Sequence, residues 1–310
     1  MKKIFIDGKA GTTGLRIYER LNNRKDIEII LLSEEERKDP AARKKALNSC
    51  DVAFLCLPDD AAKESVSMIE NENVTVIDTS TAHRTLEGWC YGFPELSHEL
   101  NDKLKTAKRI AVPGCHASGF IALVKPLIDN GFIDKSELLT CHSVTGYSGG
   151  GKKMIADYED DDRDQLLDAP RQYAITQQHK HLKEMQAITG LKNAPIFCPI
   201  VSDFYSGMMV TVPLFASQLK NGKTAGDIKA LMAKKYNAEI VRYTENIDDS
   251  GFISATKIKD SDAMLVGVCG NDERILLVAV YDNLGKGASG AAIECMNVVL
   301  GTDKTCDLDI

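Results

Sequence analysis

The chain has 310 residues, of which 44% are hydrophobic and 27% charged, so it is long enough for two globular domains of about 150 residues each. A formal charge of -7 and the lack of a Lys/Arg-rich cluster argue against a nucleic-acid-binding surface. The apolar run at the N-terminus is too short for a secretory signal, and no stretch of about 18 apolar residues is present. We therefore expect a cytoplasmic protein without nucleic-acid or membrane partners.

The first element is a short apolar strand, residues 3–7, which a glycine-rich loop and an amphipathic helix follow. In this order, glycines let the backbone approach a pyrophosphate, and the helix N-terminus supplies N–H donors. The spacing Gly-x-x-Gly-x-x-Gly departs from the usual Gly-x-Gly-x-x-Gly, so a turn with purely structural glycines stays open. The loop residues that we expect to contact a dinucleotide are Gly8, Gly11, Thr12, Thr13 and Gly14.

Strand-like and helical segments then alternate, with strands at 27–33, 51–57 and 74–78 and helices at 40–49 and 59–70. This alternation predicts a parallel, doubly wound sheet of the Rossmann type. Ligands bind such sheets at the carboxyl ends of the strands, where Ser33, Pro58 and Ser80 lie. The second strand ends in Ser33-Glu-Glu-Glu-Arg37-Lys38, which offers acids for NAD and cations for NADP, so these residues leave the choice of cofactor open.

Cys115 follows an apolar strand and a Pro-Gly turn, and apolar residues at helical spacing come after it. A thiol at a helix N-terminus has a lowered pKa, because unpaired N–H groups and the helix dipole favour the thiolate. We therefore expect Cys115 to be a nucleophile, the alternative being a buried, inert thiol. The nine cysteines include no Cys-x-x-Cys pair and no zinc spacing, so most of them are expected to be reduced packing residues.

The second half has strand-like segments at 138–144, 196–201, 208–215, 264–269 and 275–281, with few helices between them. Gly270-Asn-Asp-Glu273 joins the last two segments as a hairpin. We expect an α/β protein in which residues 1–114 form the dinucleotide-binding domain. Residues 115–285 are expected to form an α+β domain with a mixed or antiparallel sheet, which carries the substrate.

His179, His181 and Glu184 form a group before a predicted helix, and they are candidates for moving a proton to or from the thiol. A metal site is the rival interpretation. It lacks the helical His-Glu-x-x-His pattern and any further ligand at metal spacing, so we expect none.

Gly146-Tyr-Ser148-Gly-Gly150 matches the Gly-x-Ser-x-Gly pattern of serine hydrolases, and His179 follows it in hydrolase order. A hydrolase has no use for a dinucleotide loop at residue 8, however. We therefore favour a phosphate-binding loop that ends in a cation, made of Ser148, Gly149 and Lys152.

Taken together in chain order, the segments described above are similar to those of one protein family. The chain resembles the shorter N-acetyl-gamma-glutamyl-phosphate reductases, relatives of aspartate-semialdehyde dehydrogenase. The matching stretches span nearly the whole chain: Phe5 to Gly14, Leu55 to Ala61, Val76 to Arg84, Tyr91 to Leu96, Pro113-Gly-Cys115, Gly146 to Lys152, His179-Lys-His181 and Asp282 to Ala292.

The resemblance implies NADPH-dependent reduction of an acyl phosphate in arginine biosynthesis, through a thioester on Cys115. It implies that His181, rather than His179, is the acid/base, and that the protein is a homo-oligomer, dimer or tetramer. It also implies that a C-terminal helix within 286–310 completes the dinucleotide-binding domain, and that residues 115–285 are the catalytic and oligomerisation domain. Related acyl phosphates, aspartyl or N-acetylaminoadipyl, stay open as substrates, because one methylene changes binding by only about 1–3 kcal/mol. Two interpretations without reductase chemistry also stay open, a Ser148 hydrolase and a cofactor-sensing binding protein.

The same resemblance assigns further contacts and shows two departures. It places Asn283 and Gly285 by the nicotinamide, Ser33 and Arg37 at the 2′-phosphate, and Arg84 at the substrate. The family usually continues Pro-Gly-Cys with Tyr-Pro-Thr, where this chain has His116-Ala-Ser118. The expectation is that His116 either alters the thiol or replaces a packing ring. Lys183 stands where a proline is usual, which leaves the start of the following helix open.

Overall fold

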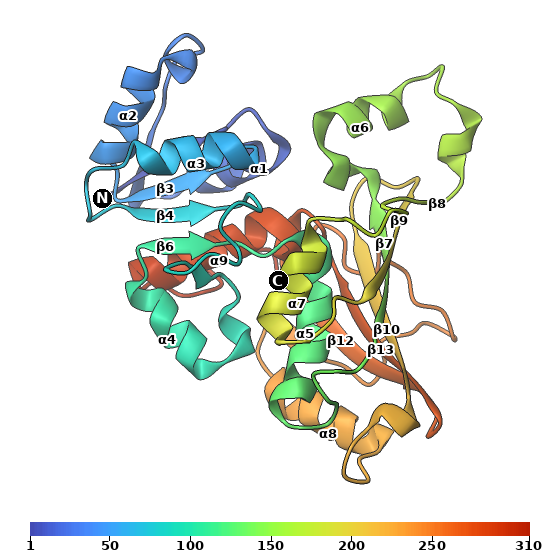
Figure 1. Cartoon of the computed structure of the whole chain (residues 1–310). Helices are drawn as coiled ribbons and strands as arrows, with labels where there is room; N and C mark the ends of the chain where they lie inside the picture. The colour runs from blue at the N-terminus through green and yellow to red at the C-terminus, as the bar shows by residue number, and fades with distance from the viewer. The chain divides into compact units, whose positions relative to one another are not determined.

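The computed structural model describes residues 1–310, and the chain divides into two compact units, each with its own sheet (Figure 1). Unit 1 comprises Met1–Gly114 and Ala288–Leu308. Unit 2 comprises Cys115–Gly287 and the last two residues.

Unit 1 is built on a parallel sheet of six strands in the order β2-β1-β3-β4-β6-β5. The strands are β1 Lys2–Asp7, β2 Ile27–Ile30, β3 Val52–Leu55, β4 Thr75–Asp78, β5 Cys90–Tyr91 and β6 Arg109–Ala111. The helices are α1 Thr12–Leu21, α2 Pro40–Ser49, α3 Asp59–Ser67, α4 His98–Thr106 and α9 Gly290–Leu300.

Alternate residues of β1 enter the two hydrophobic cores of unit 1, because successive side chains of a strand point to opposite faces. Ile4 and Ile6 pack with apolar residues of α1 and α9, whereas Phe5 packs with residues of α2 and α3. Both faces of the sheet are therefore covered by helices, and the predicted doubly wound parallel sheet is confirmed.

Unit 2 contains a seven-stranded sheet in the order β11-β12-β13-β10-β7-β9-β8. Its strands are β7 Thr140–Gly146, β8 Arg171–Gln172, β9 Ile196–Ser202, β10 Met208–Phe215, β11 Val241–Tyr243, β12 Met264–Gly270 and β13 Arg274–Tyr281. Its helices are α5 Cys115–Asp129, α6 Gly151–Glu159, α7 His181–Thr189 and α8 Ala225–Lys235. A short 3-10 turn, Tyr147–Gly150, connects β7 to α6.

The sheet of unit 2 is mixed rather than purely antiparallel. β7 pairs with β9 in parallel and with β10 antiparallel, and β11 pairs with β12 in parallel. The predicted hairpin between β12 and β13 is confirmed, with Asn271 closing the turn onto Arg274. The expectation of few helices in this half was wrong, because α6, α7 and α8 all lie between its strands in the chain.

One face of the unit 2 sheet is covered by helices, and part of the other face is not. Helix α5 packs on β10 and β13 and lies beside α7, while α8 packs on β11 and β12 (Figure 1). Twelve of the fifteen residues of α5 are buried. On the opposite face, the strands β13, β10, β7 and β9 leave a row of exposed or half-exposed side chains: Leu276, Pro213, Phe215, Thr211, His142, Val144, Ile196, Cys198 and Ile200. We call these residues the open face.

Several element boundaries differ from the predicted ones. The second strand ends at Ile30 rather than at 33, and the helix predicted over 59–70 ends at Ser67. The predicted C-terminal helix begins as a π-helical turn over Gly285–Ser289 and continues as α9. No helix of the chain is both long and apolar enough to cross a membrane.

Gly8 tests how tightly the β1–α1 loop is built. Its φ is +87°, and a Cβ there would lie 2.3 Å from the carbonyl oxygen of Cys56. Exposed Gly88 has a similar φ of +84° with no atom within 4 Å of its Cβ position, which makes it the matched control. We expect Gly88→Ala to lower the free energy of unfolding by about 1–3 kcal/mol through backbone strain, and Gly8→Ala to lower it further. Urea denaturation measures the free energy of unfolding of both variants. Equal decreases would mean that the β1–α1 loop rearranges to accommodate a Cβ at position 8.

Candidate active site

The predicted dinucleotide-binding residues of unit 1 lie along one edge of its sheet. The glycine loop follows β1, Ser33 and Arg37 follow β2, Pro58 precedes α3 after β3, and Ser80 follows β4. Because all the strands are parallel, their carboxyl ends meet at this edge. The sheet therefore brings residues that are far apart in the chain to the same edge.

The glycine loop is folded closely on itself. The N–H of Gly11 donates to the carbonyl oxygen of Gly8 at 2.9 Å, and a Cβ on Gly14 would lie 2.5 Å from that same oxygen. Gly11 is the N-cap of α1, and no side chain caps the helix. The backbone N–H groups in the first turn of α1 are thus available to bind an anion. Gly11 and Gly14 have no side chain that would prevent the anion from approaching the backbone.

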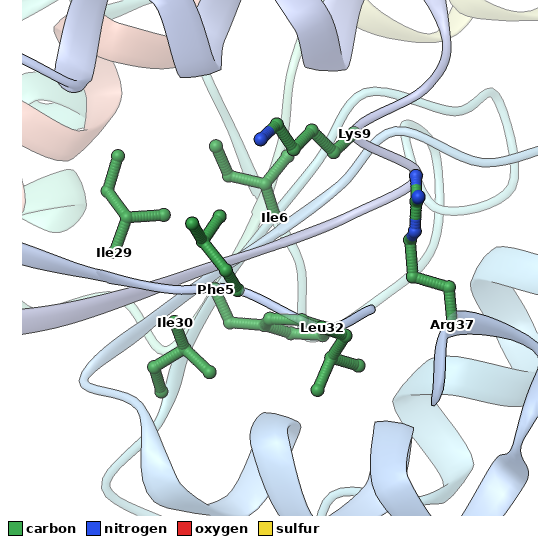
Figure 2. Close-up of a pocket in the computed structure, with 8 residues that line it drawn as sticks. Phe5, Ile6, Lys9, Ile29, Ile30, Leu32 and Arg37 are labelled. Atoms are coloured by element: carbon green, nitrogen blue, oxygen red, sulfur yellow. The ribbon is translucent and has the colours of Figure 1, made fainter. Parts of the chain in front are cut away.

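A small pocket, partly open to solvent, lies beside this loop, between β1 and the end of β2. Figure 2 shows apolar side chains around it, with Lys9 and Arg37 at its edge. The chemistry of this lining, apolar side chains with two cations beside them, suits an adenosine that carries a phosphate group. The lining residues are Phe5, Ile6, Lys9, Ile29, Ile30, Leu31, Leu32 and Arg37.

The acidic residues after β2 do not line this pocket. The carboxylate of Glu36 accepts the backbone N–H of Ser33 at 2.8 Å, and this bond lowers the pKa of Glu36. Glu34 is almost fully exposed, 3.5 Å from Arg37. Arg37 also reaches the carbonyl oxygen of Ser33, so the two residues predicted to hold a 2′-phosphate lie together.

Ser80 and Arg84, after the end of β4, are bonded within unit 1. The Ser80 hydroxyl donates to Asp78 at 2.7 Å, and Nδ1 of His83 lies 2.6 Å from the same carboxylate oxygen. Arg84 is buried and donates to the backbone carbonyls of Val112 and Thr79. The hydrogen bonds of these side chains therefore stabilise the conformation of the loop after β4.

Cys115 is the first residue of α5 and is half-buried. The Tyr281 hydroxyl donates to the Cys115 carbonyl oxygen at 2.6 Å and accepts the N–H of Gly119 at 3.0 Å. A Cβ on Gly119 would lie 2.7 Å from that hydroxyl oxygen, and one on Gly287 would lie 3.1 Å from the Cβ of Cys115. The nucleophile candidate is thus held between a tyrosine and a glycine, at the helix N-terminus that the sequence predicts.

His116 is buried directly beside Cys115 and bonds on both sides of its ring. Its Nδ1 lies 2.7 Å from the hydroxyl oxygen of Ser143 on β7, and its Nε2 lies 2.6 Å from that of Tyr173 after β8. Burial, followed by the charge of His179, lowers the pKa of His116 to about 3. The imidazole is therefore neutral at ordinary pH.

The two predicted acid/base histidines pack against this ring. His116 lies 5.9 Å from His179 and 5.6 Å from His181, between ring centroids, and Phe197 adjoins both His116 and His179. His181 is the first residue of α7, and its backbone N–H donates to Nδ1 of His179 at 3.2 Å. Lys183 does not prevent the helix from starting there. No group of three or more His, Cys, Asp or Glu is arranged to hold a metal ion.

Ser148 lies in the turn after β7, buried, and its hydroxyl accepts the side-chain N–H of Asn283 at 3.0 Å. Asn283 in turn accepts the N–H of Gly207, so its amide is used within the protein. No histidine bonds Ser148, and the hydrolase arrangement is not formed. Gly149 and Lys152 are exposed beside this turn, and Gly285 sits so close to Ser261 that a Cβ would lie 2.2 Å from its carbonyl oxygen.

Sequence patterns did not reveal three residues of this site: Tyr173, Ser143 and Tyr281. They come from three different strands or strand ends, and none belongs to a local motif. The pairing of β10 with both β7 and β13, and of β9 with β8, gathers them around α5. A single sequence carries no signal for that pairing.

Comparisons with known proteins identify the family of this chain. Residues 3–104 match the family model described as "Semialdehyde dehydrogenase, NAD binding domain", and residues 115–283 match "Semialdehyde dehydrogenase, dimerisation domain". The N-acetyl-gamma-glutamyl-phosphate reductase 2 of Nostoc sp. is 45% identical over 311 residues, which cover 96% of this chain and 97% of that protein. The chain belongs to the semialdehyde dehydrogenase family, in the branch of the N-acetyl-gamma-glutamyl-phosphate reductases. The reductase of Chelativorans sp. is likewise 45% identical, over 96% of this chain and 98% of that protein.

Solved structures of this family share the fold. Aspartate semialdehyde dehydrogenase II of Vibrio cholerae superimposes with a TM-score of 0.73 at 16% identity, over 97% of this chain and 98% of that one. The aspartate semialdehyde dehydrogenase of Candida albicans, solved with NADP, gives a TM-score of 0.66 at 16% identity, over 97% of this chain and 99% of that one. These likenesses show that the α/β fold with its two sheets is the fold of the family.

The buried His116 predicts a specific pH dependence of stability. The folded protein leaves His116 neutral down to about pH 3, whereas the unfolded chain protonates it near its ordinary pKa of 6.5. Between these values the unfolded state binds more protons, so the free energy of unfolding falls as pH falls, by up to about 1.4 kcal/mol per pH unit. His116→Gln should remove this part of the slope.

Exposed His98, the first residue of α4, provides the matched control, because His98→Gln removes an imidazole without emptying a buried site. Urea denaturation from pH 7 to pH 4 compares the two variants with the unchanged protein. A slope that His116→Gln leaves unchanged would mean that His116 is charged in the folded state.

Proposed function

We propose that this protein reduces N-acetyl-L-glutamyl 5-phosphate to N-acetyl-L-glutamate 5-semialdehyde with NADPH, releasing phosphate, in arginine biosynthesis. The observation that carries the proposal is Cys115 at the first turn of α5, where the rings of His116, His179 and His181 pack together. The reductases at 45% identity over nearly the whole chain support this substrate.

Cys115 would act as the nucleophile. Its thiolate attacks the acyl carbon, the bond from that carbon to the phosphate oxygen breaks, and phosphate leaves a thioester on the sulfur. The backbone N–H groups of a helix N-terminus favour the negative charge that develops on the carbonyl oxygen. The Tyr281 hydroxyl, bonded to both Cys115 and Gly119, keeps this first turn rigid.

His181 would hold and move the proton. It starts α7, is buried, and packs against the rings of His179 and His116. A protonated imidazole can donate to the oxygen of the reacting carbonyl, and the neutral imidazole can take the proton back as the carbon–sulfur bond breaks. His179 is the more exposed of the pair, and we assign it the supporting role.

Unit 1 would bind the cofactor as the dinucleotide-binding domain, residues 1–114 completed by the C-terminal helix. The loop of Gly8, Gly11, Thr12, Thr13 and Gly14 would take the pyrophosphate, and Ser33 and Arg37 the 2′-phosphate, with Pro58 and Ser80 along the same edge. When bound, NADPH supplies the hydride that reduces the thioester. The two cations at the edge of the pocket support NADP over NAD.

The remaining assignments concern unit 2, proposed as the catalytic and oligomerisation domain over residues 115–285. We assign phosphate binding to Ser148, Gly149 and Lys152, because the turn after β7 is short, glycine-rich and followed by a cation. Asn283 and Gly285 would support the nicotinamide through the shape of their loop. Arg84 of unit 1 is proposed to contribute to substrate binding by fixing the loop after β4.

We further propose that the protein is a cytoplasmic homo-oligomer, a dimer or a tetramer. A second copy would cover the open face of the unit 2 sheet, whose side chains are mainly apolar and exposed or half-exposed. The description "dimerisation domain" for residues 115–283 supports this use of the unit.

Replacing the nucleophile tests the proposal most directly. Cys115→Ser should lower the rate of phosphate-dependent NADP reduction with N-acetylglutamate semialdehyde by at least about a thousandfold, because the thioester cannot form. Binding of NADPH, followed by its fluorescence, should be unchanged. Buried Cys141→Ser in the same unit is the control for loss of a thiol alone. A Cys115→Ser enzyme with full activity would contradict the covalent mechanism. If the unchanged enzyme is active only with the one-carbon-longer semialdehyde, the proposed substrate is wrong and the longer acyl phosphate takes its place.

The two histidines should differ when each is changed to asparagine. We expect His181→Asn to lower kcat about a hundredfold or more, as loss of a general acid/base does, and His179→Asn to lower it less than about tenfold. Single-turnover measurements in both directions separate the chemical step from product release. Two equally mild losses would remove the assignment of His181.

A further inference from the structure

The loop between β8 and α7, residues 173–179, is attached to β9 by a side chain. The amide of Gln177 forms two hydrogen bonds with the backbone of Phe197: its Nε2 donates to the carbonyl oxygen at 2.7 Å, and its Oε1 accepts the N–H at 2.8 Å. The backbone pairing of β8 with β9 ends at Tyr173, whose N–H donates to the Pro199 carbonyl oxygen at 3.0 Å. The Gln177 amide therefore continues the ladder of hydrogen bonds two residues further along β9.

Two residues of this loop have a backbone conformation that L-residues rarely adopt. The φ of Ala174 is +51° and that of Gln177 is +56°. The N–H of Gln177 donates to the carbonyl oxygen of Ala174 at 3.0 Å, which closes a turn between them. Such strain persists only where the surrounding contacts impose the conformation. At Gln177, the two hydrogen bonds to Phe197 supply that constraint.

Both ends of the loop contact the buried ring of His116. The hydroxyl oxygen of Tyr173 lies 2.6 Å from its Nε2, and the ring of His179 packs on it with centroids 5.9 Å apart. The ring of Phe197 contacts both imidazoles, with centroids 5.3 Å from His116 and 5.2 Å from His179. The residue that Gln177 binds is therefore also the residue on which the ring of His179 packs.

The ring of His179 also contacts the start of α7. The backbone N–H of His181 donates to its Nδ1 at 3.2 Å, and the two imidazoles pack with centroids 4.7 Å apart. A neutral imidazole whose Nδ1 accepts a hydrogen bond carries its proton on Nε2. The position of His179 thus decides both its own tautomer and the surface against which the ring of His181 packs.

We propose that Gln177 is a positioning residue for His179 and His181, the two histidines of the proposed reaction. Its amide holds the loop against β9, and the loop in turn keeps the ring of His179 on that of Phe197. The proposal rests on the proposed function, in which His181 is the acid/base and His179 supports it. Gln177 acts through these side chains and not by contact with the substrate.

Gln177→Met tests the proposal, because it keeps the length of the side chain and removes both hydrogen bonds. We expect kcat for phosphate-dependent NADP reduction to fall about three- to fivefold, since a loosened histidine is less often in the reactive position, with KM changed less than about twofold. The neighbouring Gln178 is exposed, and its side chain forms no hydrogen bond. Gln178→Met is therefore the matched control and should leave kcat unchanged.

Gln177→Gly separates positioning from a contribution to stability. Glycine adopts a positive φ without strain, so this variant loses the two hydrogen bonds and the strained conformation together. Its midpoint in urea denaturation should fall less than that of Gln177→Met, whereas kcat should fall at least as far. A role in stability alone would leave kcat unchanged in both variants under conditions where they are folded.

The tautomer of His179 gives a readout without substrate or cofactor. Protein labelled with ¹⁵N-histidine is measured by NMR at about pH 8.5, two units above the ordinary pKa of histidine, and the signal is assigned by its loss in His179→Asn. The unchanged protein and Gln178→Met should show the Nε2–H tautomer. Gln177→Met and Gln177→Gly should show a mixture of the two tautomers.

A double variant tests whether Gln177 acts through His179. If it does, its effect disappears once the imidazole is gone, and Gln177→Met with His179→Asn should lose no more kcat than His179→Asn alone. Losses that multiply would overturn this route.

The outcomes separate the claims. An unchanged kcat in Gln177→Met would overturn the proposal, and a lower kcat with an unchanged His179 signal would overturn the route through that ring. If the unchanged protein has no reductase activity, the proposed function fails. The His179 signal then decides by itself whether Gln177 fixes the ring.

Discussion

The chemistry of this protein depends on how the first turn of α5 is held. Tyr281 reaches from the end of β13 and bonds the turn at two points, the carbonyl of Cys115 and the N–H of Gly119. Gly119 is needed because any larger residue would collide with the tyrosine oxygen. The helix is otherwise mostly apolar and buried, so this contact decides where the sulfur stands relative to the sheet of unit 2.

Around that turn, several buried polar side chains each form two or more hydrogen bonds within the protein. His116 satisfies both of its nitrogens, Asn283 bridges Ser148 and Gly207, and Asp282 accepts several backbone N–H groups of neighbouring loops. Each buried bond contributes little by itself, but breaking one leaves a group without water or partner. The site is therefore rigid because its disruption is costly.

Sequence patterns were sufficient for the periodic parts of the fold and for the local motifs. The parallel alternation, the glycine loop and Cys115 at a helix start all follow from residues adjacent in the chain. The parallel pairing of β7 with β9 was not predictable, because Thr140 pairs with the distant Ile196 and neither strand carries a register signal. His116 was expected to alter the thiol or to pack, and only the neighbouring strands reveal its two hydrogen bonds.

Trp89, the only tryptophan of the chain, lies in the loop after β4 in unit 1. The ring of Trp89 stacks on His83 with centroids 4.0 Å apart, and His83 is held in turn by Asp78. Unit 2 has no tryptophan. Intrinsic indole emission therefore follows the melting of only one half of the polypeptide, and tyrosine signals or circular dichroism are needed to see whether the other half melts with it.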